Sequence, residues 1–185
     1  KSINVGMEGL VVKDLKGIYR AGAREFLWIK LKKEYMDNVS DTLDLAVVGA
    51  LYGKGRRTGI YGALLLASYD KVNDQFCTFC KVGTGFKDAD LETIHSRLSK
   101  LIINKKDDRV FSKIDMDVWF IPDLVLEISG SEITLSPIHT TNLDLVKKDV
   151  GLGLRFPVFT GKIRDDKNPE DVTDVTEIFD MFNSQ

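Results

Sequence analysis

The chain has 185 residues, a hydrophobic content of 43% and a charged content of 29%. This composition is typical of a globular protein and excludes a disordered chain, and the length allows one ordinary domain or one domain with an attached piece. The longest apolar run, residues 60–67, is too short to cross a bilayer, so we expect no membrane partner. Residues 1–33 carry eight Lys/Arg against three Asp/Glu, whereas the rest of the chain carries 18 against 25. A basic segment of this kind favours a local contact with phosphate or nucleic acid.

The N-terminal part of the chain is expected to form two strands within residues 1–33, joined by a loop at residues 14–24. Alternate side chains of the second strand point to opposite faces, so one face is apolar and the other carries Trp28, Lys30 and Lys32. Two ammonium groups in line suit successive phosphates, because Lys is a compact charge on a flexible stem. A solvated edge strand whose lysines discourage aggregation is the alternative. Two strands bury too little core, and the chain starts without Met, so we expect a piece of a longer protein.

The rest of the chain predicts a second domain. Residues 34–42 are polar and are expected to form a linker. Beyond them, hydrophobic runs and turn residues predict three strands, at residues 43–52, 60–69 and 76–82, and helical spacing predicts a helix from Asp88 with apolar positions through Ile102. A strand at 124–128, extending toward Ile133, and a short helix at 142–148 are expected next. A strand from Gly153 onward and a closing helix at 169–182 complete the predicted domain. Three strands, a helix and two strands is the order of the oligonucleotide/oligosaccharide-binding (OB) fold. The predicted fold class is therefore mainly β with helices: an OB-fold barrel (β-β-β-α-β-β) over residues 43–185 with a C-terminal helix.

Two sequence patterns invite other chemistry. Cys77 and Cys80 have a C-x-x-C spacing, but they fall in a predicted strand, and no second ligand pair completes a zinc site, so we interpret them as ordinary strand cysteines in a reducing compartment. The glycines at residues 53–59 lack the dinucleotide-binding spacing and lead into a strand, which predicts a hairpin turn. Its cations could meet a phosphate backbone; they are Lys54, Arg56 and Arg57. Gly83-Thr84-Gly85 precedes a helix without the Lys-Ser/Thr of a phosphate-binding loop, so we interpret it as a structural turn.

Five short strings, taken together and in order, resemble the ATP-dependent DNA ligases, especially the archaeal enzymes and their eukaryotic replicative relatives. These strings are Met7–Lys13, Trp28–Lys32, Lys81–Phe86, Leu135–Pro137 and Leu154–Pro157. The resemblance runs through nearly the whole chain. It implies that residues 1–33 are the last strands of the adenylation (nucleotidyltransferase) domain and that residues 43–185 are the OB domain of such a ligase. The family seals nicks in duplex DNA through enzyme-adenylate and DNA-adenylate intermediates, which implies ATP and Mg²⁺ as cofactors.

The resemblance also implies roles for individual residues in nucleotide binding. Glu8 resembles the carboxylate that holds Mg²⁺ near the AMP, a position that suits a hard oxygen ligand. Lys30 and Lys32 resemble the paired lysines on the α-phosphate, and Arg24 resembles an arginine that contacts the nucleotide. The role of Lys13 is left open, because its odd separation from Glu8 would place it on the opposite strand face.

On the OB side, Arg155 and Phe156 resemble the pair that the family presses into the minor groove beside the nick, where an apolar wedge and a cation bend and widen the groove. A core position in the last strand is the alternative for Phe156. Arg164 and Lys167 match the family's R-x-D-K motif, which contacts the β,γ-phosphates of ATP; a charged surface loop is the alternative. Val158 departs from the family, which commonly has a second arginine there.

The largest departure is that the sequence contains no Lys-x-Asp-Gly motif, in which the family's nucleophilic lysine lies. Residues 113–116 are a near match that lacks the glycine, and we reject them. The isolated chain is therefore expected to be inactive, with no catalytic nucleophile of its own. The expected partners are nicked double-stranded DNA, the N-terminal remainder of the same ligase and a sliding clamp, although no clamp-binding motif is visible. The expected location is cytoplasmic for an archaeal protein and nuclear for a eukaryotic one.

Two other functions remain open at this point. An RNA-capping guanylyltransferase shares the Glu-Gly strand, the K-x-K strand and a following OB domain, but residues 154–157 and 81–86 favour the ligase. A non-catalytic OB module would bind single strands by aromatic stacking on a basic groove. The acidic character of residues 34–185 weighs against that module.

Overall fold

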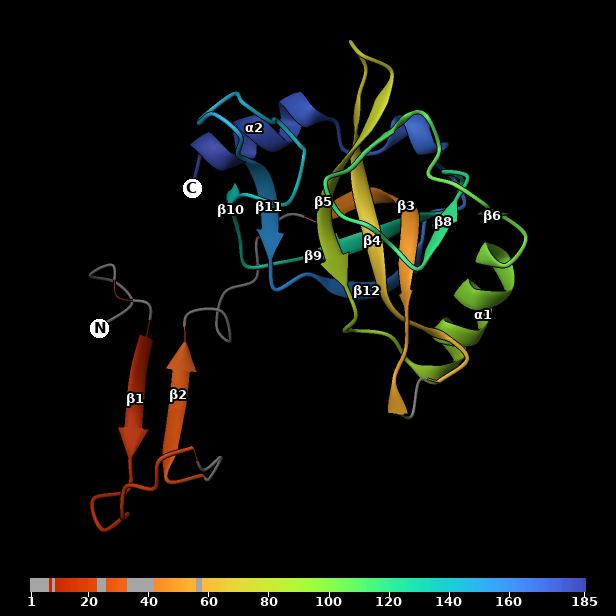
Figure 1. Ribbon diagram of the computed structural model, residues 1–185. Helices are drawn as coiled ribbons and strands as arrows, with labels where there is room; N and C mark the ends of the chain where they lie inside the picture. The colour runs from red at the N-terminus through yellow and green to blue at the C-terminus, as the bar shows by residue number, and fades with distance from the viewer. Residues whose placement is uncertain (1–6, 8, 23–25, 33–41, 56–57) are drawn as a thin grey trace. The chain divides into compact units, whose positions relative to one another are not determined.

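The computed structural model describes residues 7, 9–22, 26–32, 42–55 and 58–185. The chain divides into two compact units, Lys1–Ser40 and Asp41–Gln185. Among the described residues, the first unit contains a two-stranded sheet, and the second contains an eight-stranded sheet and a separate two-stranded one (Figure 1). Among the described residues, none of the helices is both long and apolar enough to span a membrane.

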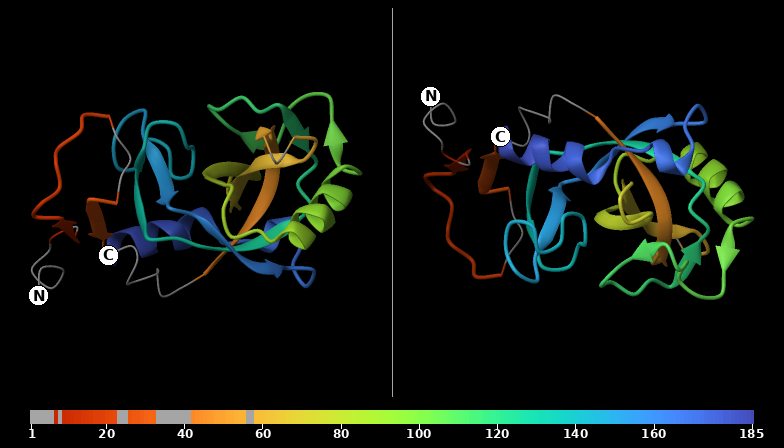
Figure 2. Two further views of the ribbon diagram at one scale, coloured as in Figure 1. Left: turned by 90° about the horizontal axis from the view of Figure 1, so that it is seen from below. Right: turned by 90° about the horizontal axis from the view of Figure 1, so that it is seen from above.

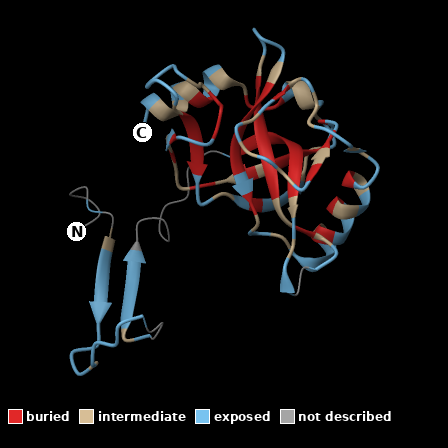
Figure 3. Ribbon diagram, viewed as in Figure 1, coloured by how far each residue is buried: buried red, intermediate tan, exposed pale blue. Residues whose placement is uncertain are grey.

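The N-terminal unit is built on an antiparallel pair, β1 (Gly9–Lys13) and β2 (Trp28–Lys32), as the sequence predicts. In this register Val11 lies opposite Lys30, and Lys13 lies opposite Trp28. The turn after β1 is closed by a hydrogen bond from the Asp14 amide to the Leu27 carbonyl, at 2.8 Å. The described side chains of both strands are mainly exposed (Figure 3), so this hairpin does not bury a core of its own.

The C-terminal unit is organised around β3 (Leu43–Tyr52), which pairs with β4 (Tyr61–Asp70) on one side and with β9 (Val125–Ser129) on the other. Beyond these, β5 (Gln75–Val82) pairs with β4, and β12 (Val158–Ile163) pairs with β9. Strand β3 is buried over residues 43–50, because its alternate side chains enter two different cores. Leu45 and Val47 belong to the main core, whereas Ala46 and Val48 belong to a smaller core on the other face.

The sheet curls into a half-barrel, and a backbone hydrogen bond links β12 to the segment that follows β5 (Figures 1 and 2). The amide of Phe159 in β12 donates to the carbonyl of Thr84, just after β5, at 3.0 Å. Helix α1 (Asp88–Leu98) covers one end of the barrel and buries Leu91 and Ile94, whose spacing is that of one helix face. Three long strands and a helix follow in the predicted order, and the fold class is confirmed as mainly β with few helices.

The C-terminal helix α2 (Val175–Asn183) lies away from α1 (Figures 1 and 2). The side chain of Asp174 caps its N-terminus by accepting hydrogen bonds from the amides of residues 176 and 177. Its apolar face packs on the main core through Ile178. The side chain of Gln185 then pairs with both backbone groups of Ile133, at 2.7 and 3.0 Å, and so fixes the chain end against β10 (Glu132–Ser136).

Several element predictions were wrong in detail. The strand predicted to run through Ile133 is two strands, β9 and β10, and Gly130 between them allows the Leu154 side chain to pack closely. The last strand is likewise divided, into β11 (Gly151–Arg155) and β12, by Phe156 with a φ of 50° and by Pro157, which has no amide to donate. The short helix predicted at 142–148 is a series of turns, because Asn142 and Asp144 have positive φ angles.

The closing helix was also predicted too long. A 3₁₀ turn, η4 (Pro169–Asp171), comes first, and α2 begins four residues later. The segment between them is extended, because Thr173 exchanges backbone hydrogen bonds with Asp44 and Tyr69. Helix α1 ends at Leu98, before the predicted Ile102. Three short strands were not predicted: β6 (Ile102–Ile103), β7 (Val110–Phe111) and β8 (Val118–Phe120).

Candidate functional site

The basic face of the hairpin lies in the N-terminal unit. Lys30 is exposed in the middle of β2, and strand alternation places it on the same face as Lys13 and Trp28. The Lys13 ammonium lies 4.3 Å from the centroid of the Trp28 ring, within the range of a cation–π contact. The opposite face is aliphatic throughout. This arrangement leaves Lys30 exposed on the face that also carries Lys13 and Trp28.

Not all of the predicted nucleotide-binding residues of this unit belong to the part of the chain that the structure describes. Glu8, the predicted metal ligand, and Arg24, the predicted nucleotide contact, lie outside the described residues. The backbone of Lys32 ends β2 opposite Gly9, but its side chain lies outside the described part. These roles stay predictions. The role of Lys13 was left open in the sequence, because its odd separation from Glu8 predicts the opposite strand face. The structure pairs Lys13 with Trp28, a contact that depends on the register of β1 against β2.

In the C-terminal unit, Arg164 and Lys167 meet at one carboxylate. Oδ2 of Asp44 lies 2.6 Å from Nη1 of Arg164 and 2.7 Å from Nζ of Lys167. Arg164 also forms a bidentate pair with Asp166, at 2.7 and 2.8 Å. This pairing raises the pKa of the Arg164 guanidinium and holds the pKa of the Asp166 carboxyl well below its usual range. The structure therefore brings both predicted phosphate-binding cations together.

Asp44 was missed in the sequence, where it is one polar residue in a buried strand. It is 8% exposed, and its second oxygen, Oδ1, has no hydrogen-bond partner among the described residues. A carboxylate between Leu43 and Leu45 was the available signal, because buried charges are normally paired. Glu127 lies opposite Asp44 on β9, with an oxygen 3.9 Å from Arg164. The two cations are thus held by acidic groups of the chain itself.

The turn between β11 and β12 presents Arg155 and Phe156 outward. Phe156 is 48% exposed, so the alternative that it is a core residue is excluded. The guanidinium of Arg155 lies 4.9 Å from the centroid of the Phe156 ring, and Nη1 of Arg155 pairs with Glu132 at 2.9 Å. The turn therefore presents a cation and a half-exposed ring in contact with each other. Val158, the residue that departs from the family, is also exposed on this side of the turn.

The glycine-containing segment between β3 and β4 forms the predicted hairpin turn. The Gly53 amide donates to the carbonyl of Ile60 at 2.8 Å, and the Thr58 hydroxyl donates to that of Gly55 at 2.7 Å. Lys54 is exposed on this turn, whereas Arg56 and Arg57 lie outside the described residues. The turn closes on itself and joins two strands, so it is not a dinucleotide-binding loop.

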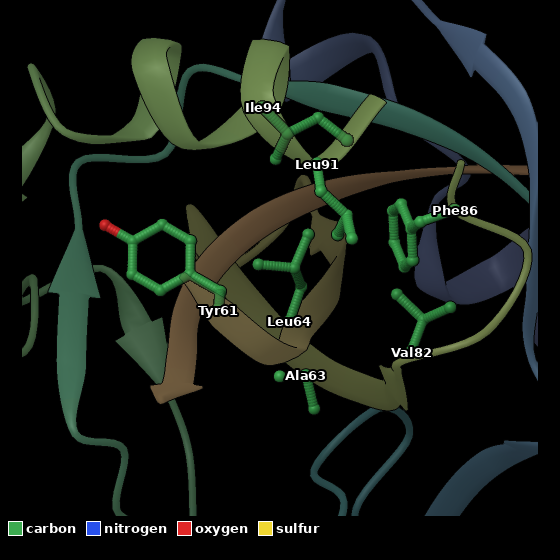
Figure 4. A pocket seen from close by; sticks show the side chains of 8 residues that line it. Tyr61, Ala63, Leu64, Val82, Phe86, Leu91 and Ile94 are labelled. Carbon is green, nitrogen blue, oxygen red and sulfur yellow. The ribbon is translucent and has the colours of Figure 1, made fainter. Parts of the chain in front are cut away.

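Other candidate chemistry finds no support in the described residues. Cys77 and Cys80 are buried strand cysteines, as predicted, and burial raises the pKa of both thiols, that of Cys77 to about 12. The part of the chain that is described contains no group of three or more His, Cys, Asp or Glu residues arranged to hold a metal ion. A small depression between α1 and the sheet is apolar, since the side chains that point into it are those of Leu64, Val82, Phe86, Leu91 and Ile94, with Tyr61 at the edge (Figure 4).

Known proteins with similar sequences are DNA ligases. Residues 57–167 match the family model of the ATP-dependent DNA ligase C-terminal region. The chain is 53% identical over 186 residues to a DNA ligase of Caldivirga maquilingensis, covering all of this chain and 31% of that protein. It is 53% identical over 187 residues to a probable DNA ligase of Persephonella marina, covering all of this chain and 32% of that protein. It is 51% identical over 184 residues to a DNA ligase of Cenarchaeum symbiosum, covering all of this chain and 31% of that protein. The chain therefore spans about a third of the length of these curated relatives.

Solved structures show the same fold at lower identity. The ligase domain from M. tuberculosis LigD superposes with a TM-score of 0.53 and 24% identity, over 93% of this chain and 49% of that one. A mycobacterial DNA ligase D complexed with ATP and MES gives a TM-score of 0.50 and 24% identity, over 94% and 48% of the two chains. At this identity the likeness supports the fold alone.

Proposed function

Because the chain belongs to the ATP-dependent DNA ligase family, of which it carries the C-terminal region, we propose that it is the part of a nick-sealing ligase that grips duplex DNA at the nick and supplies cations to the nucleotide. The observation that carries the DNA role is the outward Arg155–Phe156 turn, because the Phe156 ring is 48% exposed beside the Arg155 guanidinium, and its φ of 50° is a conformation that concentrates at functional sites. The family match favours the ligase over the capping guanylyltransferase.

The chemistry that we propose is three successive displacements at phosphorus. A lysine of the remainder of the ligase attacks the α-phosphate of ATP and releases pyrophosphate, the AMP moves to the DNA 5′-phosphate, and the 3′-hydroxyl then displaces AMP. Lys30 and Lys32 would neutralise the α-phosphate, with Arg24 on the nucleotide. Cations fixed at a phosphoryl group spread the charge that develops there, which lowers the barrier to in-line displacement.

Arg164 and Lys167 would act at the outer phosphates in the first step only. Both cations are paired with Asp44, at 2.6 and 2.7 Å, so a triphosphate would compete with this carboxylate for them. A phosphate offers more oxygens than one carboxylate, and Arg binds phosphate bidentately. Once pyrophosphate leaves, the pairs with Asp44 can form again. We propose that this exchange releases the two cations from the nucleotide after self-adenylation.

We propose that Glu8 binds Mg²⁺ next to the nucleotide. A single carboxylate together with substrate phosphates is an ordinary environment for this ion, which keeps several waters. The ion would supply charge neutralisation at the phosphates. In the whole ligase we propose a role in DNA replication, repair and recombination, with the N-terminal remainder as obligatory partner; the sequence offers no clamp-binding motif for a sliding clamp.

DNA recognition is tested by the affinity of the 185-residue chain for a nicked duplex and for the same duplex without the nick. We expect the chain to prefer the nicked duplex and F156A to abolish that preference, with Lys54 and its neighbours Arg56 and Arg57 adding salt-dependent phosphate contacts. F111A, which removes another exposed ring of the same unit, is the matched control and should keep it. Equal affinity for both duplexes, or tighter binding of single strands, would contradict the proposal.

Nucleotide chemistry is tested with α-labelled ATP and Mg²⁺. We expect no covalent AMP on the isolated chain, because its sequence has no Lys-x-Asp-Gly nucleophile. Supplying an N-terminal ligase part that contains this motif should restore sealing of nicked DNA, and K30A should weaken it. A labelled band on the chain alone would show that a different lysine acts as nucleophile.

A further inference from the structure

We infer that Thr84 and Gly85 are positioning residues for the Arg155–Phe156 turn, and that they hold the Phe156 ring in the orientation that enters the DNA groove. The inference rests on the proposed DNA role of this turn. The two residues lie in the segment between β5 and α1, about 70 positions earlier in the chain than the turn.

Hydrogen bonds from this segment fix both ends of the Pro157–Phe159 backbone. The Thr84 hydroxyl donates to the carbonyl of Pro157 at 2.9 Å, and the carbonyl of Thr84 accepts from the Phe159 amide at 3.0 Å. Pro157 follows Phe156 directly, so the carbonyl that Thr84 holds sets the direction in which the chain leaves Phe156. One threonine therefore ties down the C-terminal side of the turn with its side chain and its backbone.

Gly85 permits this close approach. Its φ is 91°, a conformation that favours glycine. A Cβ atom at this position would collide with the carbonyl oxygen of Phe159 and would lie 2.7 Å from its amide nitrogen and 2.8 Å from Cγ1 of Val158. The colliding atoms are mainly backbone, so they could yield only by moving β12. The ring of Phe86 stacks on that of Phe159 at 4.8 Å between centroids and fixes the same strand from inside.

The other side of the turn is held from the β9–β10 connection. The Ser131 amide donates to the carbonyl of Arg155 at 3.0 Å. Phe156 is thus left between two fixed peptide groups, with a φ of 50°. A non-glycine residue in this region is strained and persists only where its surroundings impose the conformation. Holding the ring in place before DNA arrives removes an ordering cost from binding.

The structure explains why glycine and threonine stand together in residues 83–85. Gly83-Thr84-Gly85 resembles a phosphate-binding loop only in composition, and the sequence predicts a turn. The structure shows that the turn contacts backbone of β12 at a site where a Cβ has no room. The residues act through Phe156 and need not touch DNA.

The test compares two glycine substitutions that both place a side chain at a positive φ. In G85A the new methyl group meets β12, whereas in G161A the position also has a positive φ, of 97°, but no atom lies within 4 Å of the added Cβ. We expect G85A to weaken binding of the full chain to nicked duplex about tenfold. G161A should change it less than about twofold. T84V should weaken binding, whereas T84S, which keeps the hydroxyl, should bind nicked duplex as the wild type does.

A double-mutant cycle separates positioning from general damage. If Gly85 acts through Phe156, G85A should have no further effect on nick binding in the F156A background. A 2-aminopurine base beside the nick gives a second measurement at saturating protein. Its fluorescence should rise when the ring unstacks the base, and this rise should be lost in G85A even when all the DNA is bound. Thermal unfolding of each variant reports the change in stability.

The outcomes distinguish the two levels of the proposal. If F156A leaves nick binding unchanged, the DNA role of the turn fails, and this inference fails with it. If F156A weakens binding but G85A does not, or if the two effects add, Gly85 does not position the ring and the DNA role stands. A loss in G85A that is absent from G161A and absent from the F156A background supports the inference.

Discussion

At the residue scale, the Asp44 carboxylate joins two cations that lie far from it in the sequence. It accepts from both Arg164 and Lys167 while it is 8% exposed. We predict that D44A lowers the free energy of unfolding by about 2 kcal/mol, because Arg164 and Lys167 lose a buried charged acceptor, while Arg164 keeps its pair with Asp166. D165A is the control, since Asp165 forms an exposed pair with Arg97 and should cost less than about 1 kcal/mol. Urea unfolding measures both; equal costs would show that the Asp44 cluster is no more than a surface contact.

His139 makes stability depend on pH. Burial lowers its pKa from 6.5 to about 4, Lys81 adds to the shift, and Nδ1 has no hydrogen-bond partner among the described residues. Between pH 6.5 and 4, His139 is protonated in the unfolded chain but stays neutral in the folded chain. The free energy of unfolding therefore falls as the pH falls through this range. We predict that His139 accounts for a loss of about 2 kcal/mol between pH 7 and pH 5.

The variant H139Q should remove this part of the pH dependence, as measured by urea unfolding at the two pH values. H95Q is the control, because His95 is the other histidine of the chain and is only partly buried, against Tyr61. The prediction fails if wild type and H139Q lose the same stability on acidification.

The residue scale also shows what the sequence could and could not predict. Arg164 and Lys167 were predicted from a short motif, and they do lie together. Asp44 lies 120 positions before Arg164, and nothing in the sequence links the two. Phe156 was predicted to be presented outward, whereas the reason it stays there, Thr84 and Gly85, depends on barrel closure. Pairings between distant segments are set by the fold, and one sequence does not reveal them.

At the scale of elements, a row of hydroxyl groups fixes the segment before β11 to β5. Thr141 donates to the carbonyl of Cys77 or Thr78 at 3.1 Å, and its hydroxyl lies 2.9 Å from that of Ser68. Ser68, Thr78 and Thr141 are fully buried. We predict that T141V, which keeps the shape and removes the hydroxyl, lowers the free energy of unfolding by about 2 kcal/mol, because buried acceptors lose their donor.

A double-mutant cycle with S68A checks this. The two hydroxyls are partners, so the cost of the double variant should differ from the sum of the single costs. Strict additivity would mean that each hydroxyl acts through the backbone carbonyls alone.

Long apolar runs made the main elements predictable, whereas short and divided elements were not. Strands β3, β4 and β5 have eight to ten residues each and were predicted close to their true bounds. Strands β6, β7 and β8 have two or three residues, too few for alternation to be recognised. The false helix at 142–148 had helical spacing but contains left-handed residues, whose φ values are local outcomes of turn packing.

At the scale of the whole molecule, the two units differ in how their strands are covered. Residues 43–50 of β3 are buried between two cores, whereas the hairpin strands β1 and β2 are exposed on both faces. The order of elements predicted the barrel, because each apolar run must be buried and few topologies achieve this. The boundary of a separate linker at 34–42 stays a prediction, since most of these residues lie outside the described part.

Amide hydrogen exchange should report this difference directly. The aliphatic face of the hairpin is about half exposed, at 49–55% for Leu10, Val12, Ile29 and Leu31, and an isolated two-stranded hairpin is marginally stable in water. We therefore predict that the ladder amides of β1 and β2 open with a free energy below about 2 kcal/mol. The amides of β3 and β4 in the same sample serve as the internal control and should exchange only with global unfolding, at about 5–15 kcal/mol. Equal protection of the two ladders would mean that the hairpin is covered in the isolated chain, and the exposed faces would then need another explanation.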